Sequence, residues 1–216
     1  MLPNINLVEV FIIFVVLLFS LSVHEAAHAW TADRLGDPTA RLLGRITLNP
    51  AVHADPIGTI VFPLIGLLTN VNFLLGWAKP VPVNITRLRG NWKRKYMLIA
   101  AAGPASNLVL ALIAALVLRV LPGTTLEPTV DAALTPLIRF LDVAVGLNVL
   151  LAVFNMVPVP PLDGGNVVAG LLQGPVAEMY ERLRPYGFII LYGLMFSGVL
   201  ATIISPPARF LLYWLR

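Results

Sequence analysis

The chain has 216 residues, of which 58% are hydrophobic and 12% are charged, and its mean hydropathy is +0.85. Soluble domains carry roughly 25% charged residues, so this composition excludes an ordinary soluble domain and indicates an integral membrane protein. The absence of cysteine excludes disulfides and thiolate metal ligands, and a formal charge of +4 suits contact with an anionic membrane surface better than nucleic-acid binding.

The first apolar stretch predicts a membrane helix over residues 7–32, and this helix contains the sequence HEAAH at residues 24–28. Residues four apart on a helix share one face, so the imidazoles of His24 and His28 can both reach one zinc ion. Glu25 can then activate a water molecule on that ion. Because ionisable groups inside a membrane are costly and mark function, the motif predicts a zinc hydrolase centre at membrane depth. We do not expect this helix to be cleaved off as a signal peptide.

The region between residues 33 and 95 combines polar loops with a second apolar run over 57–76. Basic residues on both sides of this run, together with the break at Pro63 and Gly66, favour a re-entrant hairpin over a spanning helix. The sequence KPVPVN, which begins at Lys79, favours extended backbone. We therefore expect a short edge strand or β-hairpin there.

The second half of the chain predicts core helices over 96–121 and 133–157. A turn and a short helix follow over 158–173, and a C-terminal helix covers 186–204 and ends before two consecutive prolines. No internal repeat is visible. The sequence therefore predicts one all-α polytopic membrane domain over 1–216.

A catalytic zinc ion usually has three protein ligands, so two histidines leave one position to fill. Asp163 is the best acid, because it follows a proline-rich turn that we expect at the membrane depth of the HEAAH motif. An ordinary Asp-Gly turn is the alternative for Asp163. His53 has three interpretations: a residue of an interfacial loop in which Asp55 caps the following segment, a substrate gate or oxyanion partner near the metal or its supporting residues, or a ligand in place of Asp163.

Three motifs in this order resemble the site-2 protease family of intramembrane zinc metalloproteases, peptidase family M50. They are HEAAH at 24–28, GPASN at 103–107 and NMVPVPPLDGG at 155–165. The closest likeness is to the compact bacterial branch that lacks a PDZ domain. The resemblance implies a three-helix core, with flanking helices around it.

The resemblance also implies the roles of individual residues. His24, His28 and Asp163 would hold one zinc ion, and Glu25 would be the catalytic base. A segment over 76–84 would present the substrate as an added strand, which assigns substrate pairing to Lys79, Val81 and Val83.

Two amides are further candidates. Asn107 is interpreted either as a helix-packing residue or as a hydrogen-bond partner of the substrate. Asn155 is expected to be a substrate or oxyanion contact or to support the metal ligands, because an amide near the metal turn is costly to bury unpaired.

The expected function is hydrolysis of peptide bonds in transmembrane or membrane-associated substrates near the cytosolic face. Regulated intramembrane proteolysis or clearance of membrane peptides would be its biological setting. The alternative is a non-catalytic zinc-binding scaffold or a zinc-handling protein. Arginine and lysine residues in the loops after the first helix and before 96–121 place both loops in the cytoplasm. We therefore expect a multi-pass protein of a prokaryotic plasma (inner) membrane; the sequence leaves its oligomeric state open.

Overall fold

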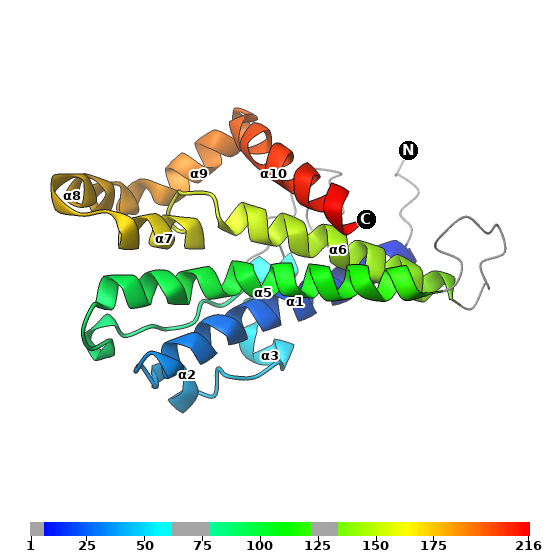
Figure 1. The fold of residues 1–216 in the computed structure, drawn as a ribbon, viewed down its shortest axis with the longest axis horizontal. Helices are drawn as coiled ribbons and strands as arrows, with labels where there is room; N and C mark the ends of the chain where they lie inside the picture. The colour runs from blue at the N-terminus through cyan, green and yellow to red at the C-terminus, as the bar shows by residue number, and fades with distance from the viewer. Residues whose placement is uncertain (1–6, 62–77, 122–133) are drawn as a thin grey trace.

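The computed structural model describes residues 7–61, 78–121 and 134–216, and these residues are mostly helical (Figure 1). Among them, three helices are long and apolar enough to cross a membrane: α1 (Leu7–Arg34), α5 (Trp92–Val120) and α6 (Thr135–Asn155). They correspond to the predicted helices over 7–32, 96–121 and 133–157. The predicted helical fold class and the predicted integral membrane character are therefore confirmed.

Helix α5 lies at the centre of the fold and packs against α1, α6 and α7 (Figure 1). It begins where the Asn91 side chain accepts a hydrogen bond from the Arg94 backbone N–H at 3.1 Å. Ala114 and Ala115 of α5 are buried against Val145 of α6. Small residues of this kind let two membrane helices approach closely, and this packing holds α5 between the other two long helices.

Between α1 and α5 the described chain forms only short elements: α2 (Thr39–Leu42), α3 (Pro50–His53), the π-helical turn η1 (Pro56–Val61) and the 3-10 turn η2 (Ile85–Arg87). The only strand pairing among the described residues is one antiparallel bridge between Ala54 and Ala78. The edge strand or hairpin expected near 76–84 is thus represented by this bridge and by irregular chain after it. Most of the run expected to be re-entrant, from residue 62 onward, lies outside the described residues.

The chain after α6 forms α7 (Asp163–Leu171), α8 (Gly174–Leu183), the 3-10 turn η3 (Arg184–Tyr186), α9 (Gly187–Phe196) and α10 (Val199–Leu215). Helix α8 was not predicted. The single C-terminal helix predicted over 186–204 is wrong, because two helices bent by 79° take its place (Figure 1).

Local features explain both the bend between α9 and α10 and the continuation of α10 through its two prolines. Gly198 has a φ of 77°, a left-handed conformation that ends a helix and that glycine adopts without a steric penalty. Helix α10 then continues through Pro206 and Pro207 instead of stopping before them. The Ser205 hydroxyl donates to the Ala201 carbonyl at 2.6 Å, the kind of side-chain bond that helps a membrane helix to tolerate proline.

Candidate metal centre

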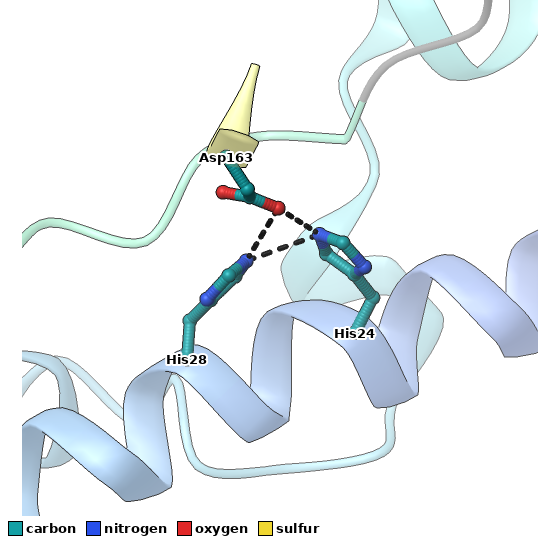
Figure 2. A group of neighbouring side chains, drawn as sticks. All are labelled: His24, His28 and Asp163. Carbon is teal, nitrogen blue, oxygen red and sulfur yellow. Dashed lines mark hydrogen bonds and ion pairs between the residues drawn. The ribbon is translucent and has the colours of Figure 1, made fainter. Parts of the chain in front are cut away.

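Two imidazoles on α1 face the same point in the protein interior. His24 and His28 lie one helical turn apart, both are buried, and their Nε2 atoms are 3.0 Å from each other. The helix periodicity alone produces this arrangement, because residues four positions apart project from one face. Figure 2 shows the two rings converging from α1 on the carboxylate of Asp163.

The carboxylate comes from a distant part of the chain. Asp163 is the first residue of α7, and α7 packs on α5 beside the two histidines. Its Oδ2 atom lies 3.0 Å from His24 Nε2 and 3.3 Å from His28 Nε2 (Figure 2). Among the described residues this is the only group of three or more potential metal-ligating side chains that converge in this way.

The hydrogen bonds behind the imidazoles fix which nitrogen of each ring faces inward. His24 Nδ1 lies 2.7 Å from the side-chain oxygen of Asn107, and His28 Nδ1 lies 2.7 Å from the Ile99 carbonyl. Both partners are acceptors, so in the neutral rings both Nδ1 atoms carry the proton and both Nε2 atoms present a lone pair. Two imidazole lone pairs and a carboxylate oxygen therefore point at one another in a buried space.

A bound cation would offset the repulsion between these converging electron-rich atoms. The Oδ2 atom of Asp163 is buried and has no hydrogen-bond donor in the described structure. Ligands at zinc distances of about 2.0–2.2 Å in tetrahedral geometry lie roughly 3.3–3.5 Å apart, close to the 3.0–3.3 Å separations found here. The nitrogen and oxygen donors are also those that zinc prefers when no thiolate is present. The site fits a zinc ion.

Gly103 of α5 has no side chain, and this leaves space for the two imidazoles. A Cβ atom built on Gly103 would lie 2.3 Å from His28 Nε2 and 2.5 Å from His24 Nε2. Any side chain at this position would therefore occupy the space into which the imidazoles point. Gly103 is the first residue of the GPASN motif, and the sequence did not reveal that this residue faces the two imidazoles.

Glu25 lies next to the two histidines and is also largely buried. Its Oε2 atom accepts a hydrogen bond from the Val81 backbone N–H at 3.0 Å. Val81 stands between Pro80 and Pro82, which have no N–H to donate. The segment 78–84 is therefore held directly against the carboxylate of Glu25.

A cavity of about 570 Å³ opens in front of these groups and is lined by His24, Glu25, His28 and Asp163. Segment 78–84 contributes Val81 and Val83 to its wall, and the rest of the wall is mainly apolar. Large apolar and aromatic side chains from α1, α5, α6 and α9 contribute to this wall, among them Leu21, Tyr96, Ile99, Phe154, Phe188 and Tyr192.

Comparison with known proteins identifies the family. The sequence model of peptidase family M50 matches residues 12–198, which is most of the chain. The chain belongs to peptidase family M50. No solved structure matches the chain.

Curated relatives agree with this assignment. A Bacillus subtilis protein named "Putative zinc metalloprotease YwhC" is 35% identical over 89% of this chain and 83% of its own length. A Mycolicibacterium smegmatis protein named "Putative zinc metalloprotease Rip2" is 29% identical over 91% of this chain and 78% of its own length. Family and relatives together make this chain a membrane metalloprotease of the zinc-dependent type.

Of three other polar residues predicted for the site, Asn107, Asn155 and His53, one lines the cavity. Asn107 is fully buried, with its amide nitrogen donating to Asn148 at 2.8 Å and its oxygen against His24 Nδ1, so its side chain does not line the cavity. Asn155 lines the cavity, although its amide donates to the Leu151 carbonyl at 3.0 Å. His53 is buried against the Thr47 carbonyl at 2.8 Å and does not line the cavity.

Lys79 belongs to the segment through its backbone, and its N–H donates to the His53 carbonyl at 2.8 Å. Sequence reasoning missed the contribution of Asn148. Its side chain reaches this network from α6, and only the packing of three helices brings it there.

Proposed function

We propose that this protein is a site-2-type intramembrane zinc endopeptidase. His24, His28 and Asp163 would hold one zinc ion, and Glu25 would be the catalytic base. The observation that carries the proposal is the convergence of three ligand atoms, all within 4.8 Å of one another, beside a carboxylate at the wall of a largely apolar cavity. The 1–216 chain would act as one membrane-embedded protease domain.

The residues divide the chemical work between them. When bound, zinc supplies Lewis-acid chemistry by polarising the scissile carbonyl and lowering the pKa of water. Glu25 takes the proton of the attacking water and later delivers it to the leaving amine. The Val81 N–H holds one oxygen of Glu25 and leaves the other to handle the proton. Asn107 and the Ile99 carbonyl keep both imidazoles in the ligating tautomer.

The substrate class follows from the cavity and from segment 78–84. A peptide bond inside a helix is shielded, so a transmembrane substrate must be extended before it can be cut. We propose that Lys79, Val81 and Val83 pair with the substrate as an added strand, and that Asn155, on the cavity wall, supports the developing oxyanion. The apolar wall favours membrane-derived sequences.

The position of the site along α1 supports cleavage near one membrane surface. His28 lies six residues before Arg34, the basic residue in the last turn of α1, which corresponds to roughly 9 Å along the helix axis. Basic residues mark the cytoplasmic side. We therefore place the site toward the cytoplasm of a prokaryotic plasma membrane, where it would serve regulated intramembrane proteolysis or peptide clearance.

The proposal is tested by cleavage of labelled transmembrane peptides in proteoliposomes. The wild type is compared with Glu25→Gln, which keeps an acceptor for the Val81 N–H but cannot take a proton. Glu178→Gln, on an exposed position of α8, is the matched control. Cleavage by wild type and control that is lost in Glu25→Gln and with a chelator supports the proposal. A zinc-loaded wild type that cleaves no member of a broad peptide panel contradicts it.

A further inference from the structure

Arg45 is a buried cation whose hydrogen bonds within the described part of the chain all go to backbone carbonyls. Its side chain lies in the loop between α2 and α3 and the residue is 5% exposed. One terminal nitrogen donates to the Val52 carbonyl at 2.8 Å, and the other donates to the carbonyls of Lys79 and Pro80. Within residues 7–61, 78–121 and 134–216 no carboxylate lies within ion-pair distance of its guanidinium. Burying a charge without a counter-ion is costly, so this position calls for a specific explanation.

The three carbonyls that Arg45 binds explain why it is buried here, because they belong to the two chain segments that meet at the Ala54–Ala78 bridge. Val52 precedes that bridge on one side, and Lys79 and Pro80 follow it on the other. The planar fork of a guanidinium can bond several acceptors in fixed directions. Arg45 therefore joins the α2–α3 loop region to the start of segment 78–84.

A buried anion holds the other end of the same segment. Asp37 is fully buried and accepts a hydrogen bond from the Asn84 backbone N–H at 2.6 Å. Its other oxygen is occupied by the backbone N–H and the hydroxyl of Thr39. The cation thus binds carbonyls at residues 79 and 80, and the anion binds an N–H at residue 84.

The contact with Glu25 lies between these two attachments. Val81 follows the carbonyls that Arg45 binds and precedes the amide that Asp37 binds, and its N–H donates to Glu25. A shift of the segment at either end would move this N–H and the cavity-lining side chains of Val81 and Val83 together.

We propose that Arg45 is a positioning residue for catalysis: through the Lys79 and Pro80 carbonyls it fixes segment 78–84 against Glu25 and sets the register in which a substrate strand is presented. This inference rests on the proposed function. Arg45 itself does not line the cavity, so it acts through the segment and touches neither the substrate nor the metal ligands.

The first test measures cleavage rates, cut positions and zinc content. Arg45→Ala is expected to lower kcat/KM by about 10²-fold, the effect of a misplacement of about 1 Å, and to spread cleavage over neighbouring peptide bonds. Zinc content should stay at the wild-type value. Arg45→Lys keeps the charge but lacks the guanidinium fork, and its kcat/KM should lie between those of the wild type and Arg45→Ala. Arg41→Ala is the matched control, because the Arg41 side chain is 59% exposed and pairs with Asp33.

A cross-link provides a rescue that a general loss of stability would not show. The chain has no cysteine, so Ala54→Cys with Ala78→Cys introduces one defined pair. The Lys79 N–H bond to the His53 carbonyl lies beside this pair. Ala54 and Ala78 are therefore directly opposite each other without bonding to each other. In a non-hydrogen-bonded pair of this kind the Cα atoms lie about 4.5 Å apart, which is within the range that a disulfide spans. When Arg45→Ala is combined with these two cysteines, oxidation to the disulfide should restore the wild-type cleavage rate and the wild-type cut position.

The oxidised and reduced forms of each double-cysteine protein are compared, and the double-cysteine protein with Arg45 intact is the reference. Faster disulfide formation with Arg45 than with Arg45→Ala supports the placement of the segment and needs no enzymatic activity. The inference is overturned if Arg45→Ala and Arg45→Lys cut the wild-type bond at the wild-type rate. It is also overturned if the oxidised Arg45→Ala protein, with full zinc, stays as slow as its reduced form. A wild type that cleaves nothing contradicts the proposed function instead.

Discussion

Gly103 on α5 offers the sharpest test of the metal centre, because it faces the point where the ligands converge. In Gly103→Ala the new methyl group would lie 2.3 Å from His28 Nε2 and 2.5 Å from His24 Nε2. Real Cβ atoms essentially never approach a neighbour more closely than 3.0 Å, so the two nitrogens would have to retreat by about 0.7 and 0.5 Å.

These displacements are large for a metal site. Metal–ligand distances in a sound site stay within about 0.2 Å of their normal values. The rings also cannot retreat freely, because their Nδ1 atoms are tied to Asn107 and to the Ile99 carbonyl. Breaking such supporting bonds alone costs about 10–100-fold in metal affinity. We therefore expect Gly103→Ala to bind zinc at least 10-fold more weakly, a loss of at least about 1.4 kcal/mol.

The assay is zinc stoichiometry by elemental analysis, combined with a chelator competition that yields the affinity. Gly146→Ala is the matched control: a Cβ atom there would meet only the Arg216 guanidinium, at an ordinary 3.6 Å. The control should bind zinc like the wild type. If Gly103→Ala binds one zinc ion with wild-type affinity, the ligand geometry described above is wrong.

Three further predictions concern the groups at the candidate metal centre. Asp163→Ala should lower zinc occupancy in the purified protein, since its carboxylate is the proposed third ligand; full zinc with intact activity would argue against that role. Asn107→Leu should weaken zinc binding by about 10–100-fold, because His24 loses the acceptor of its Nδ1 proton; unchanged chelator resistance would show that the bond is dispensable. Val81→Pro should lower kcat with zinc retained, since Glu25 loses its N–H donor, and Val81→Ala, which keeps that donor, should preserve more of kcat. Equal kcat values for the two variants would contradict this account.

The sequence alone determined the features that depend on neighbouring residues. The apolar stretches predicted the three long helices, and helix periodicity placed His24 and His28 on one face of α1. The proline-rich turn before Asp163 marked the element from which the third convergent group comes. Each of these conclusions needs only composition, local spacing or the resemblance of motifs.

The helix break at Gly198 shows where composition stops being informative. The run around it is apolar on both sides, and the sequence predicted that the helix ends before the two prolines that follow. The observed chain bends at the glycine and continues through the prolines. Both outcomes fit the same composition, and the backbone conformation at one residue separates them.

Tertiary structure decided every contact between distant segments. The bonds from Asn107 to His24, from Val81 to Glu25 and from Arg45 to the Lys79 and Pro80 carbonyls join residues far apart in the chain. The physical reason lies in the membrane setting. Helix faces toward lipid and faces toward the protein interior are both apolar, so hydrophobic patterning does not fix how each helix is rotated about its axis. That rotation, which determines which polar groups meet, comes from the packing of the helices against one another.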